Sequence, residues 1–172
     1  FKEQGILEAY ESPEAAAIAD AYKDPDHLYT GARLVVMGLA YNTAKVTGDE
    51  IPTKWTDLRN GHYRDMIVMT DPTESGTTAY LVGALVNNEK YGWEFFEKLA
   101  AMGTELDSGT SGTHNNVAAG GYKVCIAVDY VTQTLQGQGS PIQFVYPAED
   151  TIAIASPIGL VKGSANQENG KL

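Results

Sequence analysis

The sequence predicts an α/β fold built around a largely parallel sheet, and two observations predict it. Short apolar runs of the length typical of buried strands recur along the chain, at residues 33–41, 66–69, 124–128, 142–146 and 151–155. Apolar residues at helical spacing lie between them, at residues 75–86 and 91–102, with further helix starts near 115–119 and 131–135. Such alternation is typical of sheets whose strands run mostly in one direction.

The composition indicates a folded domain that does not bind nucleic acid. At 172 residues the chain can bury a core, and it forms one domain or one and part of another. A hydrophobic content of 43% and a charged content of 20% exclude a disordered chain. The formal charge of −10 argues against nucleic-acid binding, because phosphates require clustered Lys and Arg.

The single cysteine and the start of the chain say little about the cellular compartment. Cys125 lies in the apolar run 124–128, which predicts an inert core residue and excludes an internal disulfide. This fits a reducing compartment and also exported proteins without disulfides. No apolar run has the length of a membrane span, and residues 1–5 lack the basic start of a signal peptide. We expect a mature chain or a piece excised from a longer protein.

The first third of the chain is expected to hold two short helices and a long strand. Residues 14–22 favour a short helix, and residues 33–41, rich in Leu and Val, favour the first strong strand. Residues 51–58 favour another short helix, in which Trp55 and Leu58 are one turn apart.

Residues 66–80 carry the strongest functional signal. Four apolar residues predict a buried strand, which Asp71-Pro72 ends because proline cannot donate to a sheet. Ser75 is a favoured N-cap residue, so a helix is expected to begin after it. The start of that helix, Ser75-Gly76-Thr77-Thr78, would offer unpaired N–H groups, the positive end of the helix dipole and a glycine that allows close approach. Such a start suits an anion.

The same residues have a simpler interpretation, which is a well-capped helix after a strand. Capping explains Ser75 fully, but it does not explain Thr77 and Thr78, both mediocre helix formers, in the first turn. On this stretch alone plain capping is the better interpretation, and only its neighbours favour a binding site.

Residues 91–102 form the clearest amphipathic helix of the sequence. Its spacing predicts one buried face and one exposed face carrying Glu94, Glu97 and Lys98. The residues expected on the buried face are Trp93, Phe96, Leu99 and Ala100. An aromatic stripe of this kind indicates core packing rather than a cofactor site.

Two later segments are expected to join residues 71–78 at one edge of the sheet. Residues 104–107 favour a short extended segment, and the loop 108–113, which includes Ser111 and Thr113, leads into a helix. Asp129-Tyr130 follows the buried strand 124–128. Ligands of such sheets bind beyond the carboxyl ends of the strands, so we expect these hydroxyl-bearing segments to converge there.

Several catalytic and metal motifs are absent from the sequence. The histidines His27, His62 and His114 lack metal-ligand spacing with one another and with Cys125. Ser75 lacks the preceding glycine of a nucleophile elbow, although His114 could in principle serve it across a cleft. Residues 109–114 lack the Gly-Lys-Ser/Thr ending of a phosphate loop, and residues 137–139 lack the third glycine of a dinucleotide fingerprint.

An ordered set of segments nevertheless resembles one protein family over nearly the whole chain. The segments are Tyr29-Thr30-Gly31-Ala32-Arg33, Tyr41-Asn42-Thr43, Pro52-Thr53-Lys54-Trp55-Thr56-Asp57-Leu58, Asp71-Pro72-Thr73-Glu74-Ser75-Gly76-Thr77, Tyr91-Gly92-Trp93-Glu94-Phe95-Phe96-Glu97-Lys98-Leu99, Val145-Tyr146-Pro147 and Ala155-Ser156-Pro157-Ile158-Gly159-Leu160. The set closely resembles the extracellular solute-binding proteins of ABC importers, in the family that includes iron(III), thiamine and 2-aminoethylphosphonate receptors.

The resemblance implies a periplasmic-binding-protein-like (type II) fold, in which two α/β lobes close on a ligand through crossover strands. Residues 42–150 would form the second lobe, a three-layer αβα unit with a mixed, mostly parallel sheet. Residues 1–41 would be a remnant of the first lobe with the first crossing, and residues 151–172 the second crossing with the return to that lobe. A chain that lacks most of the first lobe is expected to bind ligand weakly.

The resemblance also implies a ligand contact at the Ser-Gly-Thr turn. With the segments above, it leads us to expect ligand contacts at Ser75, Gly76, Thr77, Thr78, Ser111, Thr113, Asp129, Tyr130 and Asn42. Iron-binding members carry paired tyrosines where this chain has Tyr130 followed by Val131, and the usual Gly-Glu and Gly-Thr are replaced by Gly120-Gly121 and Asp150-Thr151. A phosphonate, a phosphate ester or another small anion is therefore the first choice, narrowly ahead of ferric iron with a bound anion held in part by Tyr130.

The expected protein is a binding component and not an enzyme, and it needs no cofactor. Its expected partners are the anionic solute and the importer permease, and we expect a monomer in the periplasm or a membrane-anchored extracellular lipoprotein. The alternative from another class is a hydrolase or transferase acting on a phosphorylated small molecule, with Ser75 or His114 in a catalytic role.

Overall fold

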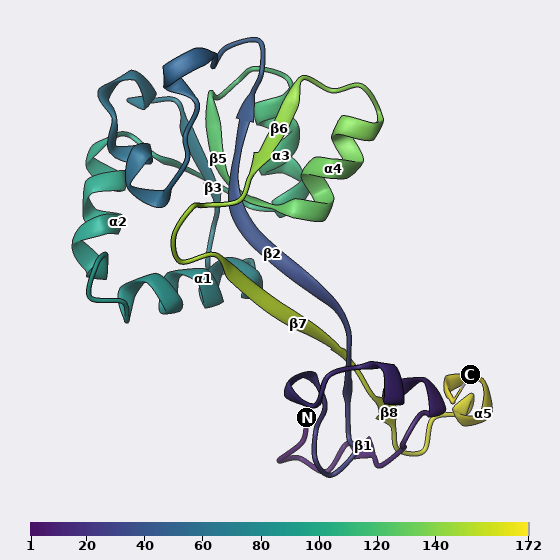
Figure 1. Cartoon of the computed structure of the whole chain (residues 1–172). Helices are drawn as coiled ribbons and strands as arrows, with labels where there is room; N and C mark the ends of the chain where they lie inside the picture. Colours follow the sequence, from purple (N-terminus) through teal and green to yellow (C-terminus); the bar gives the residue numbers. More distant parts are fainter. Residues whose placement is uncertain (172) are drawn as a thin grey trace. The chain divides into compact units, whose positions relative to one another are not determined.

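The computed structural model describes residues 1–171, which divide into two compact units (Figure 1). The larger unit is Val36–Ala153, and the smaller unit combines Phe1–Val35 with Ile154–Leu172. The divisions expected after residues 41 and 150 lie a few residues from these boundaries, because β2 (Thr30–Asn42) and β7 (Ile152–Ile158) each run from one unit into the other. That the smaller unit belongs to a first lobe stays a prediction.

The larger unit is built on a mixed sheet with the strand order β4-β3-β5-β2-β6. Its strands besides β2 are β3 (Ile67–Thr70), β4 (Glu105–Asp107), β5 (Val124–Val128) and β6 (Ile142–Val145). β3 is parallel to both β4 and β5, whereas β2 is antiparallel to β5 and to β6. β3, β4, β5 and β6 therefore run in one direction, opposite to β2, with which β7 also pairs, and the predicted α/β fold with a mixed, mostly parallel sheet is confirmed.

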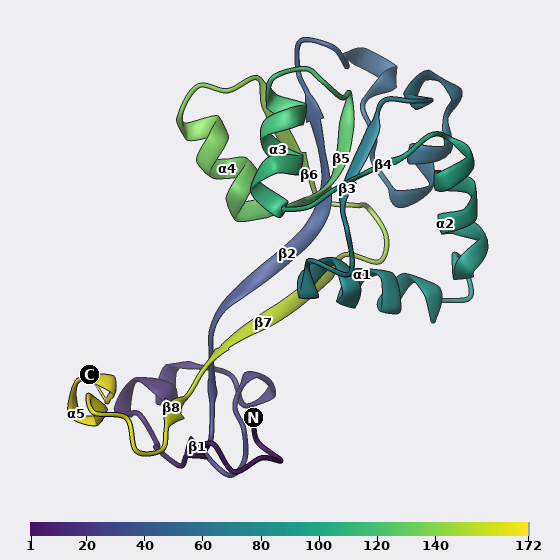
Figure 2. The same cartoon turned by 180° about the vertical axis from the view of Figure 1, so that it is seen from behind.

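Helices cover the sheet on both faces, as the two views show (Figures 1 and 2). α3 (Thr110–Ala118) packs on β3 and β5, and α4 (Asp129–Gly137) packs on β5 and β6. α1 (Gly76–Val86) contacts α2 (Gly92–Ala101), which packs against the 3₁₀ turn Trp55–Arg59. Further 3₁₀ turns lie at Gly48–Glu50 and Gly61–Tyr63. Within residues 1–171, no helix combines the length and apolarity needed to cross a membrane.

The strands alternate between two apolar layers, as a sheet buried on both faces requires. On the face of α3 and α4, one buried cluster joins four strands to α3, and its members are Ala40, Val68, Val117, Cys125, Ala127, Ile142 and Phe144. Cys125 has no exposed surface, and burial raises the pKa of its thiol well above the usual range. The prediction of an inert core cysteine is confirmed.

The smaller unit contains little buried apolar surface. β1 (Leu7–Glu8) pairs antiparallel with β8 (Leu160–Val161), and α5 covers Gln167–Gly170. The helix expected at residues 14–22 is instead two 3₁₀ turns, Pro13–Ala17 and Asp20–Tyr22, because Ile18 and Ala19 between them are extended. Among its described residues, only Ala15 and Val35 are buried hydrophobic side chains.

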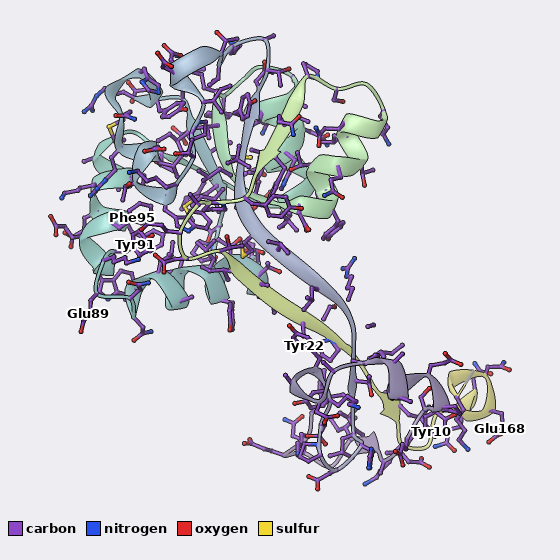
Figure 3. The ribbon with its side chains drawn as sticks, viewed as in Figure 1. Tyr10, Tyr22, Glu89, Tyr91, Phe95 and Glu168 are labelled. Carbon is purple, nitrogen blue, oxygen red and sulfur yellow. The ribbon has the colours of Figure 1, made fainter. Side chains whose placement is uncertain are left out.

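The buried face of α2 differs from the predicted one. Phe95 and Leu99 are buried, and the ring of Phe95 lies 5.6 Å from that of Tyr91 (Figure 3). Trp93, expected in the core, is 63% exposed. The helix packs the 91, 95, 99 stripe inward against the 3₁₀ turn Trp55–Arg59, so the prediction is confirmed for Leu99, whereas Trp93 and Ala100 are exposed and Phe96 is half-buried.

A glycine in the central strand provides a test of this packing. A Cβ on Gly38 would lie 2.4 Å from the carbonyl oxygen of Val145 and 2.6 Å from Cζ of Phe144. We expect Gly38→Ala to lower the free energy of unfolding by about 1–3 kcal/mol, because the β2–β6 pair must shift. Gly83→Ala, in α1 with open space around the added methyl, should instead raise it by up to about 1 kcal/mol. Urea denaturation of both variants checks this, and an unchanged stability of Gly38→Ala would contradict the packing described.

Candidate functional site

Three helices begin at one edge of the sheet in the larger unit. β3 pairs in parallel with β4 and β5 through Val68, which faces Glu105 on one side and Cys125 on the other. The carboxyl ends of these strands therefore lie together, and the chain leaves them into α1, α3 and α4 respectively. This is the edge at which sheets of this kind bind ligands.

The start of α1 is the most open of the three helix starts. Ser75 is its N-cap, and its Oγ accepts a hydrogen bond from the Thr78 N–H at 3.2 Å, as predicted. Among residues 1–171, no acceptor contacts the N–H groups of Gly76 and Thr77. A Cβ on Gly76 would meet nothing within 4 Å, so neither backbone conformation nor packing requires glycine there.

The turn before α1 is held by its own carboxylate. Oδ1 of Asp71 accepts hydrogen bonds from the N–H of Thr73 at 2.8 Å and from its hydroxyl at 2.6 Å, and these bonds lower the pKa of the carboxyl. The carbonyl of Asp71 accepts from the N–H of Ser75 at 3.1 Å. The turn is thus fixed without using the N–H groups of the helix.

The start of α3 already carries a negative charge. Oδ1 of Asp107 accepts from the Gly109 N–H at 3.1 Å, and Oδ2 accepts from the Asn116 side chain at 2.7 Å. The carboxylate lies so close to the first turn that a Cβ on Gly112 would be 2.7 Å from Oδ1. The helix begins at Thr110 rather than near residue 115, and Ser111 is exposed in its first turn.

Two of the predicted contact residues have internal roles instead. Thr113 is fully buried, and its hydroxyl bonds with that of Thr70 at 2.9 Å and donates to the Gly109 carbonyl at 3.1 Å. It ties α3 to β3 and has no surface for a ligand. The Thr78 side chain is also buried, so only its backbone takes part in the helix start.

The start of α4 is likewise occupied by a carboxylate. Oδ1 of Asp129 accepts from the Tyr130 N–H at 2.8 Å and from the Val36 N–H at 3.3 Å. Asp129 therefore joins α4 to β2, and α4 starts at this residue rather than at Val131. Tyr130 remains 42% exposed at the edge.

His114 is a buried residue whose role the sequence did not reveal. Its Nδ1 lies 2.6 Å from the Thr110 carbonyl, which can only accept, so Nδ1 carries the proton. Nε2 is then free to accept from the Val128 N–H, at 3.0 Å. The ring bridges α3 to the end of β5, and because both nitrogens are used, His114 does not serve Ser75 as a base.

The structure does not bring Asn42 to this edge. Asn42 pairs with Ile142 at the start of β6, at the opposite end of the sheet. Its side-chain amide donates to the carbonyls of Val117 and Ala118 at 2.8 and 3.1 Å, and its Oδ1 accepts from the Ala44 N–H at 2.9 Å. Asn42 closes the C-terminal end of α3, and only its bond to the Ala44 N–H, two residues on, could have been expected from the sequence.

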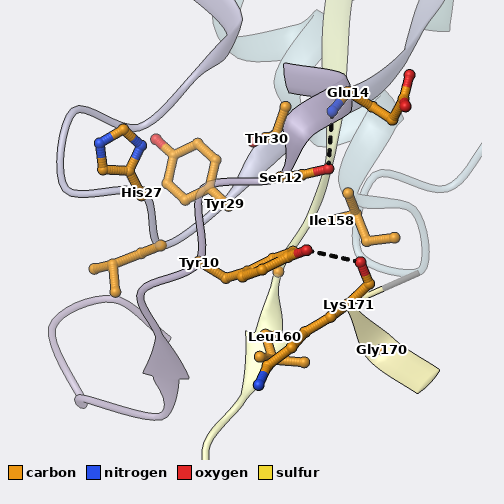
Figure 4. A pocket seen from close by; sticks show the side chains of 12 residues that line it. Tyr10, Ser12, Glu14, His27, Tyr29, Thr30, Ile158, Leu160, Gly170 and Lys171 are labelled. Carbon is orange, nitrogen blue, oxygen red and sulfur yellow. Dashed lines mark hydrogen bonds between the residues drawn. The ribbon is translucent and has the colours of Figure 1, made fainter. Parts of the chain in front are cut away.

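The edge therefore gathers Ser75, Gly76, Thr77, Ser111, Asp129 and Tyr130 from the predicted set. Within residues 1–171, no group of three His, Cys, Asp or Glu side chains is placed to hold a metal ion. The smaller unit has a separate hollow of about 200 Å³, where the Tyr10 hydroxyl donates to the Lys171 carbonyl at 2.9 Å (Figure 4). That hollow contains none of the predicted residues.

Comparison with known proteins identifies the family of the chain. Residues 1–171 match the family model described as bacterial extracellular solute-binding protein. The chain belongs to this family. It is 24% identical over 181 residues to an uncharacterized protein of Haemophilus influenzae, and 26% identical over 110 residues to a probable ABC transporter periplasmic-binding protein, y4fP, of Sinorhizobium fredii. These alignments cover 99% and 60% of the chain and 52% and 31% of those proteins.

The fold is shared with solved periplasmic binding proteins. The chain superposes on AfuA from Actinobacillus pleuropneumoniae, solved with exogenous fructose-6-phosphate bound, with a TM-score of 0.84 and 27% identity. The match covers 99% of this chain and 56% of AfuA. The chain thus spans about half the length of these relatives, and the periplasmic-binding-protein-like fold class is confirmed.

The burial of His114 makes the stability of the fold dependent on pH. Burial lowers the pKa of His114, so its stabilising contribution is complete above about pH 6.5 and is lost as pH falls below that value. We expect the free energy of unfolding to fall between pH 7 and 5 by up to about 1.4 kcal/mol per pH unit, with a smaller slope in His114→Gln. Denaturant titrations across this range measure both slopes, and the interval from pH 8 to 7 is the internal control. Equal slopes below pH 6.5 would contradict a buried, neutral His114 with a lowered pKa.

Proposed function

We propose that this chain is the lobe of an ABC-importer solute-binding component that holds a small phosphorylated or phosphonate anion at the start of α1. One observation carries the proposal. Of the three helices that begin at the sheet edge, α3 and α4 have a carboxylate of the chain against their first turn, whereas α1 has only the neutral Ser75.

The start of α1 has the chemistry that an anion requires. The N–H groups of Gly76 and Thr77 lack acceptors among the described residues, and the Thr77 hydroxyl adds a third donor. The helix dipole favours negative charge at this end, and Gly76 leaves room for close approach. Each charge-assisted hydrogen bond contributes about 1.5–3 kcal/mol, so three would support tight binding.

The other helix starts explain why a single anion position is expected. A second anion beside α3 would meet the Asp107 carboxylate, and one beside α4 would meet Asp129. Residues 71–80, 107–116 and 129–133 contain no Lys or Arg, so the anion would be held by neutral donors. Tyr130 and Ser111, both exposed at the same edge, are the side chains proposed to contact the remainder of the solute.

The alternatives have less support from the site. A tyrosinate iron centre would have Tyr130 without a second adjacent tyrosine, and the carboxylates of Asp71, Asp107 and Asp129 are engaged with backbone N–H groups. A hydrolase using Ser75 would need a base, and His114 bonds elsewhere.

The partners and location follow from the same proposal. The S. fredii relative is named as a periplasmic-binding protein of an ABC transporter, and AfuA is a periplasmic binding protein solved with a sugar phosphate. We place the chain in the periplasm, or outside the cell on a lipid anchor, as a monomer that delivers its solute to an importer permease.

Calorimetry on the full-length protein tests the assignment with phosphate esters, phosphonates, thiamine and ferric citrate. We expect a phosphate ester or phosphonate to bind without turnover, and Gly76→Ala to weaken binding about tenfold or more because its methyl enters the anion position. Thr77→Val, which keeps the shape but removes the hydroxyl, should weaken it by about three- to tenfold.

The matched control is Gly83→Ala, which adds the same methyl within the same helix. It should leave affinity unchanged. Equal affinities of the Gly76→Ala and unaltered proteins would remove the start of α1 from the site, and tightest binding of ferric citrate would favour iron. Product formation lost in Ser75→Ala would establish the enzyme instead.

A further inference from the structure

An apolar groove lies on the larger unit between α1, α2 and β4. It has a volume of about 250 Å³, and the side chains that form its walls are Met69, Pro72, Val82, Trp93, Phe96 and Leu106. Trp93 and Leu106 are 63% and 56% exposed, and the Trp93 ring lies 6.5 Å from that of Phe96, edge to face. Large apolar side chains gathered in this way are uncommon on a protein surface without a partner.

The groove borders an open strand edge. β4 is the last strand in the order β4-β3-β5-β2-β6, and among the described residues it pairs only with β3. The carbonyl of Asp107 points toward the β3 side, where it accepts from the N–H of Asp71 at 2.8 Å. Because amides alternate along a strand, the N–H and C=O of Leu106 point to the open side. Leu106 therefore presents backbone groups to a new strand and its side chain to the groove.

The charges beside the groove are negative and unpaired. Glu74 follows Pro72 closely, and Glu97 shares a helix face with Trp93, whereas Glu105, one residue before Leu106 on the strand, points its side chain to the other face of the sheet. None of these carboxylates has an ion-pair partner within residues 1–171. The cations of α2 and its C-terminal end are engaged, since Lys98 pairs with Glu94 and the Arg64 guanidinium donates to the Ala101 carbonyl.

The negative charge of these carboxylates indicates which kind of partner could occupy the groove. A second copy of the chain would bring the same carboxylates and a net charge of −10 to the contact, which opposes self-association. Anionic lipid and nucleic acid are disfavoured for the same reason. An extended peptide with alternating apolar and basic residues fits every feature, because it can pair with β4, fill the groove and neutralise the carboxylates.

We propose that this groove binds an extended apolar and basic segment of a partner protein, which adds to β4 as a new edge strand. β4 spans only Glu105–Asp107, so backbone pairing is limited to the groups of Leu106. The apolar side chain inserted beside Trp93 and Phe96 supplies most of the affinity, and Lys or Arg at the flanking positions supplies the selectivity. The groove shares Pro72 with the turn before α1 but contains none of the residues proposed to contact the solute, so the proposal does not require a bound solute.

Fluorescence and calorimetry on the full-length protein test the proposal with three capped hexapeptides, of alternating Lys-Val, Lys-Ser and Glu-Val. We expect the Lys-Val peptide to bind with one-to-one stoichiometry and to shift the emission of Trp93 to shorter wavelength, since Trp55 is fully buried. The shift should be absent in a Trp93→Phe variant, which would assign the fluorescence change to Trp93. The Lys-Ser and Glu-Val peptides should bind at least about tenfold more weakly, because one lacks apolar contacts and the other has the wrong charge.

Variants and a modified peptide separate the three contributions. Leu106→Ser, at an exposed position that leaves the fold intact, should weaken binding about tenfold. Glu97→Gln should weaken it about two- to fivefold, whereas the control Glu89→Gln, in the turn between α1 and α2, should not. N-methylation of alternate residues removes the N–H groups on one side of the peptide. Of the two Lys-Val peptides methylated in this way, the one that loses the N–H groups facing Leu106 should not bind.

Three outcomes would overturn the proposal. The first is equal binding of the Lys-Ser and Lys-Val peptides, which would mean general charge attraction. The second is a concentration-dependent dimer dissociated by Leu106→Ser, which would make a second copy the occupant. The third is a Trp93 emission that neither peptide nor acrylamide alters in the full-length protein, which would mean that the groove is covered within the chain.

Discussion

The larger unit depends on how the unpaired N–H groups at the starts of its helices are satisfied. Parallel strands bring three such starts to one edge, and each needs acceptors or must remain open to solvent. Asp107 and Asp129 supply carboxylates to α3 and α4, and each also joins its helix to another element, through Asn116 or Val36. α1 receives only the Ser75 hydroxyl, so its positive end stays uncompensated. The asymmetry between one open and two filled starts is the observation on which the proposed ligand position at α1 rests.

His114 holds this edge in register. The ring accepts from the Val128 N–H and donates to the Thr110 carbonyl, so it fixes the end of β5 against the first turn of α3. Thr113, one residue earlier, fixes the same turn to Thr70 at the end of β3. Neighbouring side chains of α3 thus secure the ends of β5 and β3, from which α4 and the turn to α1 begin. The positions of Asp129 and Ser75 therefore follow from internal hydrogen bonds of α3.

Local features of the sequence predicted the elements of the sheet but not all of the faces. Apolar runs placed the strands of the larger unit to within a few residues, and the Ser75 cap was predictable because its acceptor lies three residues away. The buried side of α2 was predicted correctly at Leu99 and wrongly at Trp93 and Ala100, since helical spacing allows both the predicted 93, 96, 99, 100 stripe and the 91, 95, 99 stripe to face inward. The choice depends on the turn Trp55–Arg59, which is distant in sequence. The same limit applies to Thr113 and Asn42, whose partners Thr70 and Val117 lie in other elements.

The role of each acidic residue depends on the groups that its carboxylate bonds, which the composition alone does not give. Asp71, Asp107 and Asp129 lie near the proposed anion position, yet each points its oxygens at N–H groups of its own surroundings. Those N–H groups partly balance the charge of the three carboxylates. Because Asp107 and Asp129 lie at the starts of α3 and α4, the start of α1 is left as the proposed anion position. Glu74 and Glu97 lack such partners among the described residues and lie close in sequence to Pro72 and Phe96, which form part of the walls of the apolar groove. A carboxylate that accepts backbone hydrogen bonds shapes the interior of a site, whereas an unpaired one beside an apolar groove attracts a cation from outside. Both proposals therefore rest on where individual carboxylates lie and what they bond, and not on the net charge of −10.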